Sequence, residues 1–237
     1  MTTASVHHVT GFGMDVDHVD PRGEASFIDR ASRRIDGRYV IDAFGADPLL
    51  MDAAAPVARA AMRVEVVHAE RLPRSGPAVL VANRGFGVLE PLALALAVRQ
   101  AVNRRIRVVA APDGIGFGPV WRKFGGIGAL ADDLGAALRA GYLVAVPLGN
   151  TWLRTGAGEP PLQLLRGAVG SPVLPVAVRP VGPFGLPVRG WRVKIGPPIT
   201  LEPGLPNKDP LAAAELAESA RDGVEGLLEM ERHPSGG

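Results

Sequence analysis

The most strongly patterned part of the chain is residues 76–98, where a short apolar run, a polar turn and a longer apolar run follow one another. Residues 78–82 read AVLVA between Ser75-Gly76-Pro77 and Asn83, which is typical of a buried strand. From Pro91 the run LALALAV has no turn residue and is long enough for a helix with proline in its first turn. The pattern predicts a strand, a tight glycine-bearing turn and a helix.

The rest of the chain repeats this alternation of strand and helix patterns. Further strands are predicted at Arg63–His68, Ile106–Ala111, Tyr142–Pro147, Pro172–Arg179 and Gly190–Gly196. Helices are predicted at Glu24–Phe44, Asp47–Met62, Ala131–Ala140, Leu162–Val169 and Asp209–Glu231. Gly141 is expected to stop the third of these, and Pro56 to kink or split the second. The alternation predicts an α/β fold, a single domain with a mixed, mostly parallel sheet flanked by helices and with the last strands antiparallel.

The same pattern sets the expected domain boundaries. Residues 1–22 have no apolar core, so we expect a disordered tail and no secretory signal there. Residues 23–62 form a predicted N-terminal helical extension, residues 63–232 the α/β domain and residues 233–237 a C-terminal tail. No apolar run reaches the ~18 to 20 residues that a transmembrane helix needs. These features predict a cytoplasmic protein.

Composition excludes several kinds of site. The chain has no cysteine, which removes disulfides, thiolate nucleophiles and cysteine-ligated metals. Its histidines, aspartates and glutamates have no metal-ligand spacing, so no metal site is predicted. A net charge of +2 is unlike the balance of a nucleic-acid-binding protein. The basic segment Arg99–Arg107 is either a solvated helix end or a surface that faces a membrane or another anion.

Four blocks, in their order along the chain, carry a resemblance to a known family. They are GPAVLVANRGFGVLEPLAL, FGGIGAL, VAVPLGNTWLRTGAGEPPLQLLRGAV and PVLPVAVRP followed by VKIGPPI. In sequence and spacing they resemble the glycerophospholipid (lysophosphatidate-type) acyltransferase family, over roughly Asp47 to Thr200. The resemblance implies the family's α/β fold and acyl transfer to a lysophospholipid-type acceptor. It also implies acyl-CoA or acyl carrier protein as co-substrate, with no bound cofactor.

The family's first motif is Asn-His, four residues, then Asp-Pro, in which the histidine is a general base oriented by the carboxylate. This chain has Asn83, then Arg84 at the position of the histidine, and Glu90 before Pro91 at the position of the aspartate. Arginine stays protonated at neutral pH and cannot act as the base. Glu90 is the one carboxylate left for that role, and the alternative is that Arg84 and Glu90 pair across the turn.

The family's third motif, Pro-Glu-Gly-Thr-Arg, binds the glycerol and phosphate of the acceptor. This chain has Pro147-Leu148-Gly149-Asn150-Thr151, so leucine and threonine replace the glutamate and the arginine. The resemblance places Asn83, Gly149, Asn150 and Thr151 in the substrate site. Arg154 and Arg166 are candidates to supply charge to a phosphate, or are surface arginines.

Three hypotheses follow. The chain is an acyltransferase of lipid metabolism with an altered site, or a catalytically inactive relative that binds acyl chains or anionic lipid at a membrane surface. The third is a nucleotide-binding α/β protein, since residues 126–131 fit a G-x-G-x-x-A pattern. They follow WRKF and not an apolar strand, which disfavours it. Partners are therefore predicted to be lipid or acyl chains, with no nucleic acid; the oligomeric state is left open.

Overall fold

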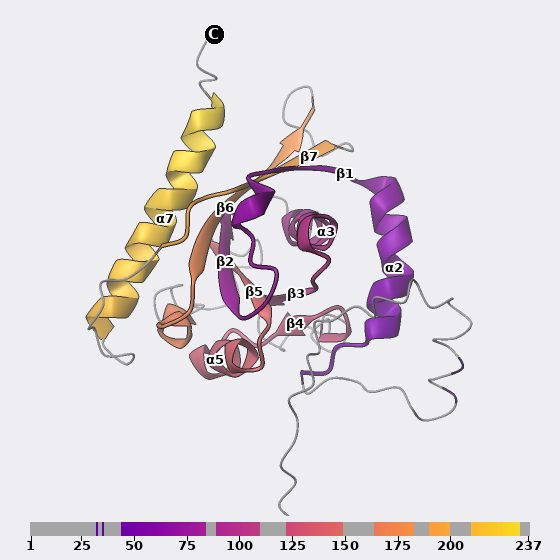
Figure 1. The fold of residues 1–237 in the computed structure, drawn as a ribbon, viewed down its shortest axis with the longest axis horizontal. Helices are drawn as coiled ribbons and strands as arrows, with labels where there is room; N and C mark the ends of the chain where they lie inside the picture. The colour runs from indigo at the N-terminus through magenta and orange to yellow at the C-terminus, as the bar shows by residue number, and fades with distance from the viewer. Residues whose placement is uncertain are drawn as a thin grey trace, which may run out of the picture.

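The computed structural model describes Ser32, Ile35 and residues 44–83, 89–109, 122–148, 164–182, 190–199 and 210–232. Within them, seven strands form one sheet in the order β1-β7-β6-β2-β5-β3-β4 (Figure 1). Their bounds are β1 Arg63–Val67, β2 Ala78–Asn83, β3 Ile106–Val109, β4 Gly126–Ile127, β5 Leu143–Leu148, β6 Val173–Val181 and β7 Gly190–Ile195.

Strand directions confirm the predicted fold class. Every neighbouring pair is parallel except β6 with β7, which is antiparallel. β1 and β7 therefore run opposite to the other five strands. All six predicted strands are present in one sheet. β4 was not predicted, because two residues are too few to show a hydrophobic period.

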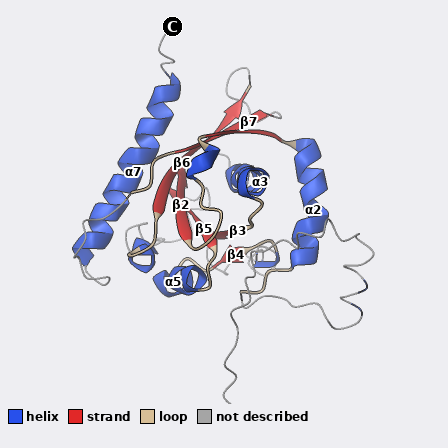
Figure 2. Cartoon of the chain, in the orientation of Figure 1, coloured by secondary structure: helices blue, strands red, loops and turns tan. Residues whose placement is uncertain are grey.

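Helices cover both faces of the sheet (Figure 2). Their bounds are α2 Pro48–Ala61, α3 Leu89–Val102, α5 Ala131–Arg139 and α7 Pro210–Arg232, with short 3₁₀ turns η1 Ala69–Arg71 and η3 Arg166–Ala168. Side chains of β2 alternate between the two layers: Leu80 packs in the cluster that contains α3, and Val79 and Val81 in the one that contains α5 and α7. A strand buried on both faces reads as a continuous apolar run, which is why β2 is visible in the sequence.

Of the two outcomes predicted for Pro56, a kink or a split of the helix, the split does not occur. The helix continues through this residue, and Asp47 caps its start by accepting hydrogen bonds from the backbone nitrogens of Leu49 and Leu50. Pro56 is exposed, whereas Leu49 and Ala55 are buried. Packing of the apolar side therefore maintains the helix although proline removes one backbone donor.

Two other local predictions are confirmed. Gly141, at φ 86°, ends α5, with its nitrogen bonded to the Leu138 carbonyl and the Tyr142 nitrogen bonded to the Ala137 carbonyl. This is the hydrogen-bond pattern of a glycine helix stop. α7 lies within one residue of its predicted bounds. Its buried positions follow a helical period through residues 213, 216, 217, 220, 224 and 227, although Leu211 is exposed.

Most of the predictions for the N-terminal part concern residues that the structure does not describe. Of the predicted helix Glu24–Phe44, Ser32 and Ile35 are helical and exposed, and most of the remainder lies outside the described residues, as do both predicted tails. Among the helices that the structure describes, none is long and apolar enough to cross a membrane.

Candidate functional site

The described elements that follow two adjacent strands, β2 and β5, pack on opposite faces of the sheet. β2 and β5 pair in parallel, with Asn83 opposite Leu148. After β2 the chain crosses to β3 through α3, on one face; after β5 it next appears at residues 164–168, packed on the other face. Such a divergence opens a crevice at the carboxyl ends of the two strands, and this is where α/β proteins bind ligands. Asn83 thus ends β2 opposite Leu148, the last residue of β5; Gly149, which the sequence predicts to lie beside Asn83, is outside the described residues.

Asn83, the last residue of β2, is fixed by β6. Its Nδ2 donates to the carbonyl oxygen of Val178 at 2.9 Å, and its Oδ1 accepts from the Val178 nitrogen at 2.7 Å. The side chain thus behaves as one further rung of the β2–β6 ladder, whose last backbone pair joins Ala82 and Val176. Asn83 holds the rim of the crevice in place.

Glu90 lies in the first turn of α3 and is 2% exposed. Its Oε2 atom is completely buried. A carboxylate in this position is stabilised by the positive end of the helix dipole. It lines a pocket together with Asn83 of β2 and Pro147 of β5; the other lining residues are Ala82, Pro91, Leu94, Val108, Ala145 and Val146. The sequence-predicted Asn83 and Glu90 are therefore brought together.

The pocket is small and mainly apolar. Its cavity volume is about 10 Å³, close to the least that holds one water molecule. Segments 84–88, 110–121 and 149–163 follow β2, β3 and β5 and lie outside the described residues. Among the described residues that line this pocket, Glu90 and Asn83 carry the polar side chains, one carboxylate and one amide.

The remaining predicted site residues separate into two sets. Arg84, Gly149, Asn150, Thr151 and Arg154 lie outside the described residues. Arg166 is exposed on η3, a turn that packs against α5 on the face opposite to α3. It does not line the pocket of Glu90.

The interpretation of Arg99–Arg107 as either a solvated helix end or an anion-facing surface is wrong for two of its members. Arg104 is 4% exposed and donates from Nη1 to the Pro73 carbonyl at 3.1 Å and from Nη2 to the Gly141 carbonyl at 2.8 Å. Arg107 is also buried, and its guanidinium lies 4.4 Å from the ring centroid of Tyr142. These two arginines hold loops and an aromatic ring inside the fold.

Among the described residues, no group of three or more histidine, aspartate or glutamate side chains is arranged to hold a metal ion. Sequence reasoning did not single out Leu94, Val108 or Ala145 as site residues, although they line the pocket. Their apolar character signalled burial alone, because a pocket floor and a core give the same pattern.

Comparisons with known proteins give the following relatives. No protein-family model matches the chain. It is similar to an uncharacterized protein of Mycobacterium tuberculosis and to one of Mycobacterium bovis, each 29% identical over 83% of this chain and 70% of the relative. Among solved structures it is similar to the 1-acyl-sn-glycerophosphate (LPA) acyltransferase PlsC from Thermotoga maritima, with a TM-score of 0.48 and 18% identity, over 85% of this chain and 94% of that one.

Proposed function

We propose that this protein is an acyltransferase-like protein of lipid metabolism, a divergent relative of the lysophosphatidate-type acyltransferases. Its site takes an acyl chain and a lysophospholipid-type acceptor. The observation that carries the proposal is the buried Glu90 beside Asn83, in the crevice between the carboxyl ends of β2 and β5. The acyltransferase motif has its orienting carboxylate at the position of Glu90 and its asparagine at the position of Asn83.

Acyl transfer at this site would use Glu90 as the base. The acceptor hydroxyl attacks the thioester carbonyl of acyl-CoA or acyl carrier protein, so that a C–O bond forms and the C–S bond breaks. The hydroxyl proton passes to the Glu90 carboxylate and from there to the leaving thiolate. Arg84 cannot take that proton, and its planar donor fork is instead suited to a phosphate or carboxylate head group.

A second function is favoured by one specific observation, the replacement of the histidine base by Arg84. Loss of a general base typically costs ~10² to 10⁴ in rate. A site without turnover can still bind lipid, since each buried methylene contributes about 0.8 kcal/mol. In this case the protein is a relative that binds acyl chains or anionic lipid in the cytoplasm, at the inner face of the membrane.

One experiment separates the two functions. Purified protein is given lysophosphatidate and acyl-CoA, and turnover is compared in wild type, Glu90→Gln and the control Glu215→Gln, which changes an exposed carboxylate of α7. We expect wild-type turnover close to background. Turnover that is lost in Glu90→Gln alone would establish catalysis by this carboxylate.

Binding is measured on the same proteins by fatty-acid displacement and by co-sedimentation with anionic liposomes. Binding that weakens in Arg84→Ala, without turnover, establishes the lipid-binding function. If wild type shows neither turnover nor binding at low salt, the acyltransferase-like proposal is wrong.

A further inference from the structure

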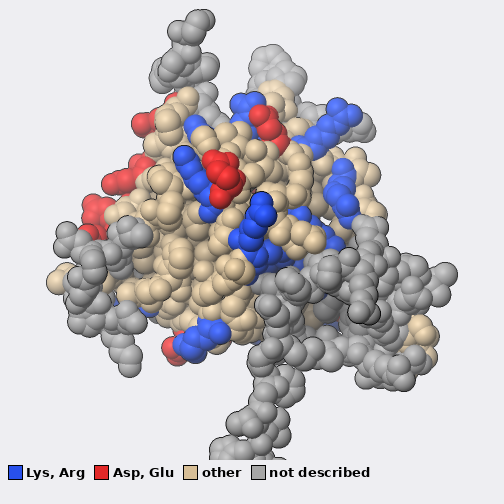
Figure 3. Space-filling model, in the orientation of Figure 1, with Lys and Arg blue, Asp and Glu red and all other residues tan. Residues whose placement is uncertain are grey.

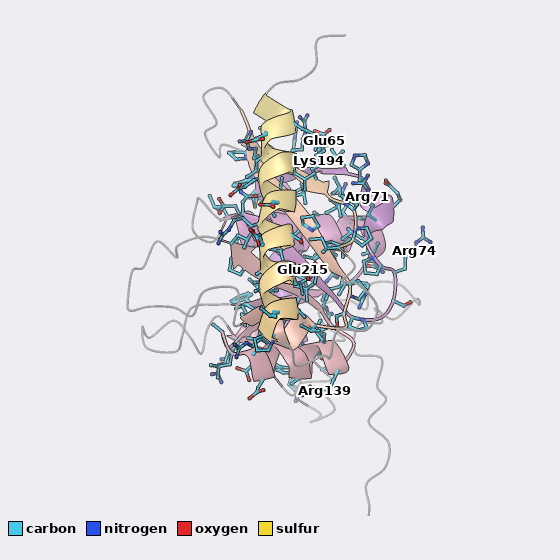
Figure 4. All side chains as sticks on the ribbon, turned by 90° about the vertical axis from the view of Figure 1, so that its left-hand side faces the viewer. Glu65, Arg71, Arg74, Arg139, Lys194 and Glu215 are labelled. Carbon is cyan, nitrogen blue, oxygen red and sulfur yellow. The ribbon has the colours of Figure 1, made fainter. Side chains whose placement is uncertain are left out.

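The outer side of α7 carries a stripe of acidic side chains. Five exposed carboxylates follow one another at spacings of three and four residues: Glu215, Glu218, Asp222, Glu225 and Glu229. This spacing places them on one side of the helix, opposite to the side that packs on β6 and β2. Figure 4 looks onto this outer side, where Glu215 is labelled, and Figure 3 shows Asp and Glu side chains along α7, at the left. None of the five forms a side-chain hydrogen bond or ion pair with another residue of the described part of the chain.

The stripe does not serve the stability of α7 itself. Its members are three or four residues apart, the spacing at which like charges on a helix repel each other, and Arg221 offsets only part of that repulsion. The first turn of α7 has no acidic residue, although the helix dipole favours one there, whereas Glu229 lies in the last turn, where the dipole disfavours it. Five carboxylates and Arg221 give this side a net charge of −4. A positive surface outside the helix would relieve the repulsion.

A positive surface lies beside α7 on the same face of the sheet. The side chains of β7 alternate between two faces. Val193 and its neighbours at positions 191 and 195 point into the core that contains α3, so Arg192 and Lys194 point to the face that carries α7. On that face α7 packs on β6 and β2, and Leu227 of α7 packs against Gly196, directly after β7. The acidic stripe and the positive surface are therefore adjacent.

Cross-strand neighbours complete this surface, which we call the β7 face and which consists of Arg63, Glu65, Arg179, Arg192 and Lys194. The register places Arg179 of β6 and Glu65 of β1 on either side of Arg192, with Arg63 two positions before Glu65. Arg192 Nη2 lies 3.0 Å from Glu65 Oε2, so these two charges cancel. The side chains of Arg63, which is exposed, and of Arg179 and Lys194, which are half-buried, have no partner among the described residues. The β7 face thus has a net charge of +3.

The two surfaces also match in size. Three strands at about 4.8 Å spacing, each about six residues long, make the β7 face roughly 14 Å by 20 Å. The acidic stripe from Glu215 to Glu229 is about 21 Å long at ~1.5 Å per residue, on a helix about 10 Å across. An exposed apolar side chain lies next to each surface, Val181 beside Arg179 and Leu211 in line with the stripe. One α7 helix can therefore cover one β7 face.

The position of both surfaces in one molecule indicates the partner. They lie side by side on one face of the sheet, so a two-fold axis between them would place α7 of each copy over the β7 face of the other. Two equal contacts then form and the assembly closes. Together they bury on the order of 1,000 Å², at the lower end for specific interfaces. Such a dimer is weak and, because it joins exposed charges, sensitive to salt.

We propose that this protein forms a two-fold dimer in which the acidic stripe of α7 from each copy binds the β7 face of the other. The pocket of Glu90 is lined by Leu94 of α3 and lies on the other face of the sheet, so the partner copy does not cover it. The inference therefore stands independently of whether the pocket transfers an acyl group or only binds lipid.

The test measures the mass of the full chain by sedimentation velocity over a range of protein concentrations at low ionic strength. We expect a concentration-dependent dimer that dissociates in about 1 M salt, where the Debye length is ~3 Å. Glu218→Lys/Glu225→Lys reverses charges of the stripe, and Arg63→Glu/Lys194→Glu reverses charges of the β7 face. Each variant alone should raise the dissociation constant of the dimer at least about tenfold.

Mixing the two variants is the decisive step. The reversed stripe of one variant then meets the reversed β7 face of the other, and the unchanged surfaces meet as in wild type. An equimolar mixture should therefore recover a dimer that contains one chain of each kind. The matched control is Arg74→Glu/Lys123→Glu, which changes net charge as the β7-face variant does, at two exposed positions outside both surfaces. It should dimerise as wild type does, and thermal melting by circular dichroism confirms that all variants fold.

Four outcomes would overturn the proposal. The first is a wild type that stays monomeric at every concentration at low ionic strength. The second is a dimer that persists in both charge-reversal variants, which would place the interface elsewhere. The third is a mixture that remains monomeric, or a control that dissociates equally, since the response would then be to net charge alone. The fourth is a mass that rises beyond two chains, which a closed two-fold assembly does not allow.

Discussion

The side-chain amide of Asn83 bonds both backbone groups of Val178, at 2.9 Å through Nδ2 and 2.7 Å through Oδ1. The two residues belong to neighbouring strands and are 95 positions apart in the chain. This contact joins the end of β2 to β6 at the rim of the pocket. Beyond this contact β6 continues to Val181, paired with β7.

Replacing Asn83 with alanine should destabilise the protein. The Val178 nitrogen and carbonyl would both lose their partner, and an unsatisfied buried polar group costs about 1–3 kcal/mol. Urea unfolding should show a lower midpoint. Gln100→Ala removes an exposed amide from α3 and should leave the midpoint within error. Equal midpoints for Asn83→Ala and wild type would show that water replaces the side chain without cost.

Replacing Arg104 with methionine should also destabilise the fold. The change keeps an apolar stem of similar length but leaves the Pro73 and Gly141 carbonyls without their charged donor, and hydrogen bonds to charged groups contribute about 1.5–3 kcal/mol each. Arg104→Lys should recover part of the lost stability, because lysine keeps the positive charge and can donate to one of the two carbonyls. The recovery should be incomplete, because a single amine cannot reach both carbonyls as the forked guanidinium does. Arg74→Met, at an exposed position of the same loop, should change the unfolding free energy by no more than about 0.5 kcal/mol.

Two glycines of α7 should respond in opposite directions to alanine. At Gly226 an added Cβ meets no atom within 4 Å, so Gly226→Ala should stabilise the helix by about 0.5–1 kcal/mol through reduced backbone entropy. At Gly223 the Cβ would lie 2.8 Å from Cγ and 2.9 Å from Cβ of Pro175, which belongs to a central strand. Gly223→Ala should therefore lower the melting temperature, and the pair is compared by calorimetry. A higher melting temperature for Gly223→Ala would contradict the close packing of α7 on β6.

Gly167 should be more sensitive to alanine than Gly141. A Cβ at Gly167 would collide with the Ala131 carbonyl oxygen and approach the Gly135 nitrogen, which are backbone atoms of α5 that cannot rotate away. Gly141 has open space around it, and its φ of 86° alone makes alanine unfavourable, by about 1 kcal/mol. Chemical denaturation should show a clearly larger loss for Gly167→Ala. If Gly141→Ala is the more damaging change, η3 and α5 are not packed as closely as described.

The strands could be predicted because burial on both faces produces apolar runs such as AVLVA in β2 and LVAV in β5. The meeting of Asn83 with the end of β5 also follows from the sequence, since parallel strands end at one edge. The pairing of Asn83 with Val178 could not be predicted, because nothing local marks a contact across 95 positions.

The roles of Arg104 and Arg107 were missed for a related reason. A run of arginines after a helix favours a solvated surface on average. Arg104 is instead buried because the loop containing Pro73, 31 positions earlier, folds over it and brings carbonyls to its guanidinium. Arg107 is buried because Tyr142 lies against it. A charged side chain usually prefers solvent, and long-range partners of this kind make its burial favourable.

The order of strands also limits how this protein can self-associate. Among the strands that the structure describes, the outermost are β1, which is five residues long and carries the exposed Arg63 and Glu65, and β4, which has two residues. Short or charged edges are poor templates for a strand from another molecule. The long apolar strands, β2, β5 and β6, are enclosed between them. Aggregation of this protein should therefore begin from unfolded chains and not from sheets that pair edge to edge in the folded state.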